Sequence, residues 1–124
     1  MDLTLTPELE AFREEVRGFL AAHASEHENG APKDPRAWQR TLIQHGYAAR
    51  TIPKAYGGYG AQPDILKGRI IAEEFIAAGA PRGMAGQGIS MLVPTLLEVG
   101  SEEQKTRWIP PTLNGDIIWC QGYS

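Results

Sequence analysis

The chain has 124 residues, a length that fits one domain with a buried core and excludes a TIM barrel or a complete two-halved dinucleotide-binding enzyme. Its 12 Lys and Arg face 15 Asp and Glu, for a formal net charge of -3, and the absence of a basic stripe argues against a nucleic-acid partner. A single cysteine excludes an internal disulfide framework and no apolar run approaches the roughly 20 residues that span a bilayer, so we expect a soluble, cytoplasmic protein without a membrane partner.

Two amphipathic helices are predicted in the first part of the chain. Thr6 and Pro7 form an N-cap followed by a proline, and apolar residues then recur at helical spacing up to about His23. The stretch 25–33 is rich in turn residues and predicts a connection. A second cap-and-proline pair starts a short helix that ends at Gly46, and we expect this helix to pack on the first.

The middle of the chain alternates between loops and apolar helices. Residues 52–63 hold too much Gly and Pro for regular structure, which predicts either an ordered loop or a linker. A third helix is expected from about Asp64 to Gly79, and its wide apolar arc predicts a central place in a helical bundle. The following segment, 84–97, is also apolar, and Pro94 is expected to kink it.

The clearest local signal lies near the C-terminus. Residues 101–104 read Ser-Glu-Glu-Gln, which predicts a capping box at the start of a further helix. We expect Pro110 and Pro111 to stop this helix. After a turn at 114–115, residues 116–121 are rich in strand-favouring side chains and are the only good strand candidate in the chain.

These elements together predict a helical domain followed by the first strand of a further domain. We expect an all-α fold, an up-and-down bundle of about five helices, over residues 1–115. Residues 116–124 then form a strand stub that has no partner strand in this chain. We interpret the stub as the first strand of a further domain.

The usual catalytic and metal-binding patterns have simpler explanations here. The glycine spacing matches neither a phosphate loop nor a dinucleotide-binding fingerprint. His23 and His27 have the spacing of metal ligands on a helix, but no third ligand recurs, and a polar helix end explains them too. Cys120 could act as a nucleophile, although no motif places a histidine near it and a buried strand cysteine is the commoner case.

One pair of acidic residues also requires a choice between two interpretations. Glu73 and Glu74 lie on a largely apolar predicted helix, where a general base is conceivable. Arg69 precedes Glu73 by four residues, so a surface ion pair is the simpler account. From the residues alone, no catalytic residue and no metal ligand is assigned, and no reaction follows.

Three stretches stand out by their order and spacing, namely residues 52–60, 100–110 and 115–124. Together they resemble segments of the acyl-CoA dehydrogenase family. Residues 52–60 (IPKAYGGYG) resemble the family's P-x-x-Y-G-G-x-G loop, and residues 100–110 (GSEEQKTRWIP) are similar to a segment that begins Gly-Ser/Thr-x-Glu-Gln-Lys. Residues 115–124 (GDIIWCQGYS) match the family's approach to the flavin site. The resemblance covers the whole chain and ends where the family's middle β domain begins.

The resemblance implies the N-terminal helical domain of a longer, three-domain enzyme. The implied reaction is the α,β-dehydrogenation of an acyl-CoA thioester with FAD as cofactor, followed by transfer of electrons to a flavin-linked acceptor. It also implies a homo- or hetero-oligomer. The family's catalytic carboxylate lies outside the matching segments, so we transfer no catalytic base to this chain and expect residues 1–124 alone to be inactive.

The resemblance also implies cofactor-binding residues near the C-terminus. Gln121 is expected to face the pyrimidine side of the flavin, and Ser124 is expected near N5 or the adjacent carbonyl group. Neighbouring residues would add backbone contacts or packing: Trp119, Gly122 and Tyr123. Alternatively, this stretch is simply the end of the chain.

A second implied site is one wall of the acyl pocket. It falls on segment 86–97 and is expected to include Gln87, Ser90, Met91 and Pro94. Ordinary core packing would explain the apolar residues of this segment as well. The alternative function for the whole chain is a non-catalytic helical interaction module that docks on a partner chain.

Overall fold

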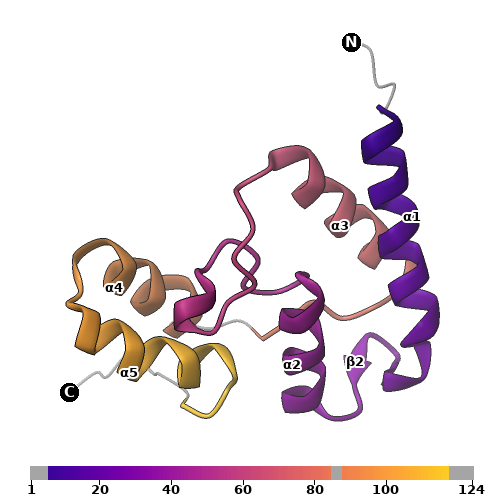
Figure 1. The fold of residues 1–124 in the computed structure, drawn as a ribbon. Coiled ribbons are helices and arrows are strands. Elements are labelled where there is room, and N and C mark those ends of the chain that lie inside the picture. The colour runs from indigo at the N-terminus through magenta and orange to yellow at the C-terminus, as the bar shows by residue number, and fades with distance from the viewer. Residues whose placement is uncertain (1–5, 85–87, 118–124) are drawn as a thin grey trace. The chain divides into compact units, whose positions relative to one another are not determined.

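The computed structural model of the protein describes residues 6–84 and 88–117, and the chain divides into two compact units. Unit 1 combines residues 1–34 with 63–82, and unit 2 combines residues 35–62 with 83–124. Within the described ranges there are five α-helices and one hairpin of two-residue strands (Figure 1). The prediction of an all-α fold with about five helices is therefore confirmed.

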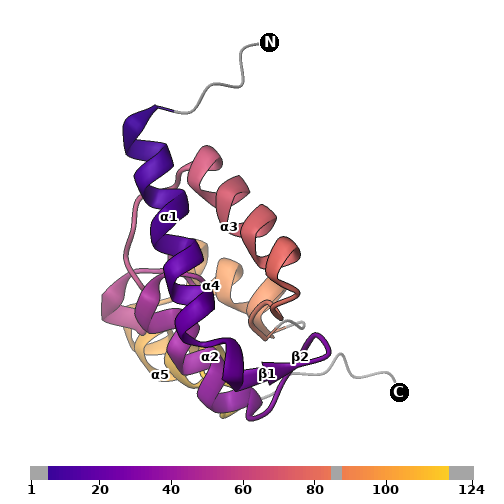
Figure 2. The ribbon, with the colours of Figure 1, turned by 90° about the vertical axis from the view of Figure 1, so that its right-hand side faces the viewer.

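Unit 1 is built on a pair of helices that lie side by side, α1 (Pro7–Ala22) and α3 (Ile65–Ala78) (Figure 2). The apolar stripe of α1 is buried as its spacing predicts, through Phe12, Val16, Phe19 and Leu20. The helix α3 offers a matching apolar face, with Ile70, Ile71 and Phe75 all buried. Within unit 1 the partner of α1 is thus α3, whereas the expected packing of the second helix on the first involves two different units and stays a prediction.

The face of α3 that packs is narrower than its composition predicts. Ile65 and Ile76 are 89% and 80% exposed in the structure, and Leu66 is 51% exposed. An α-helix that packs on one neighbour buries only one stripe of side chains, so apolar residues outside that stripe remain in solvent. The wide apolar arc of α3, which predicts a central place in the bundle, is therefore buried only in part.

The connection after α1 holds more structure than a plain loop. After the short 3₁₀ turn η1 (Ala24–Glu26), strands β1 (His27–Glu28) and β2 (Ala31–Pro32) pair in antiparallel register. The turn between them has φ of 54° at Asn29 and 77° at Gly30, the two positive values that a tight hairpin turn needs. A strand pair thus occurs outside residues 116–121, the only stretch that the sequence predicts as a good strand candidate. Residues 118–121 of that stretch lie outside the described residues.

The described part of unit 2 contains three α-helices and two short helical turns. The helices are α2 (Pro35–His45), α4 (Val93–Val99) and α5 (Glu102–Leu113). The turns are the 3₁₀ turn η2 (Lys54–Tyr56) and the π-helical turn η3 (Gly88–Leu92). The core of this unit is a cluster of buried aliphatic side chains from α2, α4 and α5: Ile43, Val93, Ile109 and Leu113.

The start of α5 forms as the sequence predicts. The hydroxyl of Ser101 accepts a hydrogen bond from the backbone N–H of Gln104 at 3.2 Å, and the Gln104 side chain accepts one from the Ser101 N–H at 3.0 Å. Both bonds satisfy amide groups that have no partner inside the helix. The predicted capping box is confirmed.

The proline pair near the end of unit 2 does not stop a helix as the sequence predicts. Pro110 and Pro111 lie inside α5, which continues to Leu113, because the burial of Ile109 and Leu113 on either side of the proline pair holds the last turn in place. The predicted stop at the prolines is wrong. Pro94 is the second residue of α4, directly after the π-helical turn η3, so the helical conformation changes next to it, and the kink expected at Pro94 stays a prediction.

Candidate functional site

A buried amide side chain joins two distant segments of unit 2. Gln39 lies on α2 and is only 2% exposed. Its Nε2 donates a hydrogen bond to the carbonyl oxygen of Leu113 at 2.8 Å, and its Oε1 accepts one from the N–H of Met84 at 2.6 Å. Leu113 comes shortly before residues 116–124, where the flavin contacts are predicted, and Met84 comes shortly before segment 86–97, where the acyl-pocket wall is predicted. The Gln39 side chain therefore joins the residues that lead into the two predicted sites.

The backbone around this amide is closely packed. A Cβ atom at Gly83 would lie 2.6 Å from Oε1 of Gln39 and 3.1 Å from the Cβ of Ala48, which leaves room for hydrogen only. Gly115 has a φ of +78°, and a Cβ there would lie 2.8 Å from the Cε of Met84. A side chain at residue 83 would thus press on the Gln39 amide, and the positive φ at residue 115 favours glycine there.

Sequence reasoning missed Gln39, although a signal for it exists. The residue precedes Leu42 and Ile43 by three and four positions, so helical spacing puts it on the same face as these two buried side chains. A polar residue in an apolar helical stripe must find hydrogen-bond partners when it is buried. That rule points to Gln39 but names neither partner, because both lie far away in sequence.

The loop at residues 52–60 is ordered and is held against α5. The hydroxyl of Tyr56 donates to the carboxylate of Glu102, with 2.8 Å to each oxygen, and the ammonium group of Lys105 lies 5.8 Å from the Tyr56 ring centroid. The hydrogen bond to Glu102 raises the pKa of the Tyr56 hydroxyl above its ordinary value. Gly57 has a φ of +92°, and a Cβ there would lie 3.3 Å from the Cα of Pro110. The loop interpretation is confirmed, and the linker alternative is excluded.

These contacts bring two of the conspicuous sequence stretches together. The loop 52–60 and the segment 100–110 touch at the Tyr56 hydroxyl and again at Gly57, near both ends of α5. At the C-terminal end of α5, Arg36 from α2 forms an ion pair with Asp116. The loop and α2 thus hold α5 and the described residues that directly follow it.

The predicted site residues are only partly described by the structure. Those expected at the flavin lie outside the described residues (Trp119, Gln121, Gly122, Tyr123 and Ser124), and so do Cys120, Gln87 and the side chain of Ser90. Met91 is 61% exposed, and Pro94 is exposed as well. Core packing therefore does not explain these two residues, whereas it does explain Val93, which is 1% exposed in the core of unit 2.

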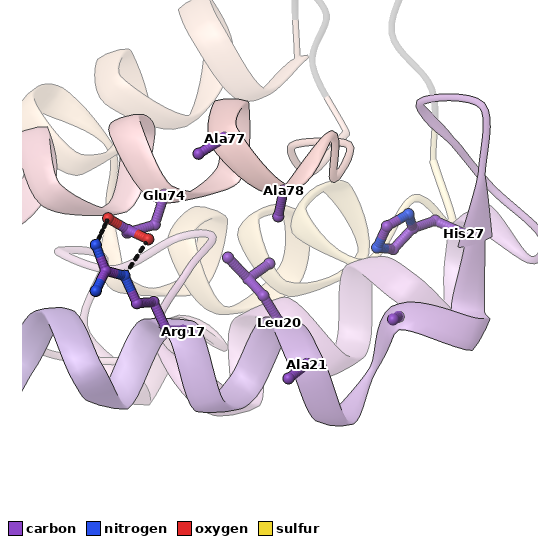
Figure 3. Close-up of a pocket in the computed structure, with 8 residues that line it drawn as sticks. Arg17, Leu20, Ala21, His27, Glu74, Ala77 and Ala78 are labelled. Atoms are coloured by element: carbon purple, nitrogen blue, oxygen red, sulfur yellow. Dashed lines mark hydrogen bonds and ion pairs between the residues drawn. The ribbon is translucent and has the colours of Figure 1, made fainter.

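Unit 1 has a pocket of its own, of about 360 Å³, between α1 and α3 (Figure 3). Its lining is mostly small and apolar: Leu20, Ala21, Ala24, Ala77 and Ala78. Arg17 and Glu74 face each other at one end, and His27 lies at the other. The charges of the first two compensate each other, because Nε of Arg17 donates to Oε1 of Glu74 at 2.8 Å.

The acidic pair on α3 is held by arginines of α1. Glu73 binds Arg13 at 2.8 Å, and Glu74 binds Arg13 as well as Arg17, so the predicted ion pair between Glu73 and Arg69 is wrong in its partner. The pairing follows the packing of the two helices, which sequence spacing cannot show. The hydrogen bond from Arg17 holds the pKa of Glu74 below its ordinary value, which is the opposite of what a general base needs.

The described residues offer little to a metal ion. The ring of His23 pairs with Glu26, in agreement with a polar helix end. Within residues 6–84 and 88–117 no group of three His, Cys, Asp or Glu side chains comes together in the way a metal ion requires. Over the same ranges no helix combines the length and the apolar character needed to cross a membrane.

Comparison with known proteins gives consistent results over nearly the whole chain. The family model described as "Acyl-CoA dehydrogenase, N-terminal domain" matches residues 6–116. Acyl-CoA dehydrogenase IpdE1 of Mycolicibacterium smegmatis is 34% identical over 94% of this chain and 32% of its own length. The protein of the same name from Mycobacterium tuberculosis is 32% identical over 94% of this chain and 33% of its own length.

Two solved structures resemble the chain at a similar level. One, the "Tcur3481-Tcur3483 steroid ACAD", has a TM-score of 0.63 and 28% identity over 95% of this chain and 32% of that one. The ChsE4-ChsE5 complex from Mycobacterium tuberculosis has the same TM-score and identity over 94% of this chain and 30% of that one. The chain thus spans about a third of the length of the relatives it matches.

Proposed function

Because the chain belongs to the acyl-CoA dehydrogenase family through its N-terminal domain, we propose that it forms the helical N-terminal part of an FAD-dependent acyl-CoA dehydrogenase. The observation that carries this proposal is the family match over residues 6–116. The proposed reaction is the α,β-dehydrogenation of an acyl-CoA thioester, for which FAD supplies the hydride acceptor. We place the end of the helical domain at residue 115 and the first strand of a β domain at 116–124.

The proposed role of this chain in the reaction is to bind and to position. α5 is fixed at its start by the capping box and by Tyr56, and at its end by Gln39. We propose that the stretch after this helix reaches the flavin, that Gln121 and Ser124 contact the ring, and that Trp119, Gly122 and Tyr123 support them. The support for these contacts is the order of the motif residues in the sequence.

We propose that the acyl chain of the substrate is bound along η3 and the first turn of α4. Met91 and Pro94 are exposed there, and an exposed apolar side chain is what a ligand-facing wall requires. Gln87 and Ser90 are proposed to line the same wall. No residue of this chain is proposed as the catalytic base, since Glu73 and Glu74 are engaged by arginines.

The partners follow from the same family membership. We propose an acyl-CoA thioester as substrate, a flavin-linked electron acceptor, and assembly with further subunits. One solved relative is the ChsE4-ChsE5 complex, which supports a hetero-oligomer as one form of that assembly. Another is named as a steroid ACAD, which makes bulky acyl groups the first substrates to test.

The test is to express the protein from its complete reading frame and to record its visible spectrum. We expect a yellow protein with flavin absorbance, bleaching on addition of an acyl-CoA, and turnover with an artificial electron acceptor. Residues 1–124 expressed alone are expected to show no turnover, and turnover by this piece would overturn our placement of the base outside it. A colourless complete protein that binds a partner chain would support the interaction-module alternative.

A further inference from the structure

We propose that Gln39 is a positioning residue, whose carboxamide sets the spacing between the approach to the acyl-pocket wall and the approach to the flavin strand. The inference rests on the proposed function, because that function assigns roles to the two segments. It concerns only described atoms: the Gln39 side chain, the Met84 N–H and the Leu113 carbonyl group. Its partners are 45 and 74 residues away in sequence, so the amide links parts of unit 2 that the chain itself does not connect closely.

The chemistry of the link is specific to a carboxamide. The Leu113 carbonyl group can only accept a hydrogen bond, and the Met84 N–H can only donate one, so the bridging group must donate on one side and accept on the other. Glutamine does both with one planar head, and the two partners fix which side carries the nitrogen. An ionised carboxylate could still accept from Met84 but would face the Leu113 oxygen without a proton to share.

The position of the Leu113 carbonyl group at the end of α5 is a second reason why it requires a hydrogen-bond donor from outside the helix. It belongs to the last turn of α5, where carbonyl groups have no N–H partner further along the helix. The neighbouring carbonyl oxygens of Pro110, Pro111 and Thr112 accept from backbone N–H groups of the following turn. Gln39 thus completes the end of α5 from a different helix, and it ties that end to Met84 in the same step.

The link is rigid because its surroundings leave no room to move. Gln39 is 2% exposed, and its Oε1 lies so near Gly83 that a Cβ at residue 83 would be 2.6 Å from it. On the other side, Met84 reaches the backbone at Gly115, so the two bridged segments also touch each other. A change in the length or polarity of residue 39 therefore shifts one segment against the other.

The test compares Gln39→Met and Gln39→Glu with the wild type, as holoenzyme from the complete reading frame. Gln39→Met removes both hydrogen bonds, whereas Gln39→Glu keeps the one from Met84 and loses the one to Leu113 when it is ionised. We expect kcat at saturating acyl-CoA to fall about tenfold or more in Gln39→Met, since small misplacements of reacting groups are costly, with a smaller fall in Gln39→Glu. We also expect weaker FAD binding, an altered flavin absorbance envelope and faster hydrogen exchange at the Met84 amide.

Two further variants keep the test decisive. Val16→Ala removes fully buried atoms in unit 1, and it should lower the unfolding midpoint while leaving kcat and the flavin spectrum unchanged. Gly83→Ala keeps glutamine at position 39, but the added Cβ clashes with its Oε1 and displaces the amide. This variant should therefore reproduce the functional defect even if Gln39→Met folds poorly.

Two results overturn the inference, and they can be told apart. If the wild type has flavin and turnover, and the Gln39 and Gly83 variants behave like Val16→Ala, then Gln39 is a stabilising residue only and the positioning role is wrong. If the wild type itself has neither flavin nor turnover, the proposed function fails and the inference falls with it.

Discussion

Replacing Gly58 with alanine probes why the loop at 52–60 needs two glycines in succession. Gly57 needs its freedom of backbone conformation, because its φ is +92°. Gly58 has no such requirement, but a Cβ there would lie 2.7 Å from the carbonyl carbon of Ile52 and closer still to the carbonyl oxygen. Atoms of the backbone cannot rotate out of the way as a side chain can, so the loop itself must shift.

The size of the effect can be worked out from the bonds that this shift disturbs. The Ile52 carbonyl oxygen accepts from the Gly60 N–H at 2.9 Å, and the Gly58 N–H donates to the Pro53 carbonyl oxygen at 3.1 Å. Weakening both costs about 1–2 kcal/mol, and overpacking costs about 1–3 kcal/mol more. Alanine returns about 0.5–1 kcal/mol by restricting the unfolded chain. The expected net loss for Gly58→Ala is about 1–4.5 kcal/mol.

The measurement is urea unfolding of the chain followed by far-UV circular dichroism. Gly18→Ala is the matched control: Gly18 lies inside α1 with nothing within 4 Å of its Cβ position, so alanine there should stabilise by about 0.5–1 kcal/mol. The same substitution is thus expected to act with opposite signs at the two sites. An unchanged or raised midpoint for Gly58→Ala would refute the steric argument.

Two further predictions concern charges and caps. Glu74→Gln should lower the free energy of unfolding at neutral pH, because the lowered pKa of Glu74 means that its ionised carboxylate stabilises the fold. The difference from wild type should close as the pH falls below about 4.5 and through the lowered folded-state pKa, since the carboxylate is then protonated. Urea melts between roughly pH 7 and 3 will check this, and a difference that stays constant with pH would contradict it. Ser101→Ala should cost about 1 kcal/mol of stability through loss of the capping box, whereas Ser101→Thr should keep most of it, and equal losses in the same melts would speak against capping.

The helix starts were predictable because they depend on neighbours in sequence. The side chains of Thr6 and Asp64 accept from backbone N–H groups three residues ahead, at 3.2 and 3.0 Å, just as their positions before the helices suggest. Ser101 does the same within its capping box. A cap is completed within four residues, so nothing distant can override it.

The failures share the opposite property, since each depends on a contact far away in sequence. Glu73 lies four residues from Arg69 but binds Arg13, because α1 packs on that face of α3. Pro111 does not end α5, because buried neighbours hold the helix beyond it. The spacing of Gln39 marks it as a buried polar residue but does not reveal its partners, because these lie on segments that only the fold brings together. Packing decides these cases, and local pattern does not.

The division of the chain into units has a consequence for its synthesis and its cleavage. The backbone passes from one unit to the other at three points, after residues 34, 62 and 82. During translation, unit 1 has all its described helices once residue 82 has emerged, whereas the first half of unit 2 must wait for residues 83–117 before its core can close. A protease that cuts once near residue 60 releases neither unit, because each resulting fragment carries part of both.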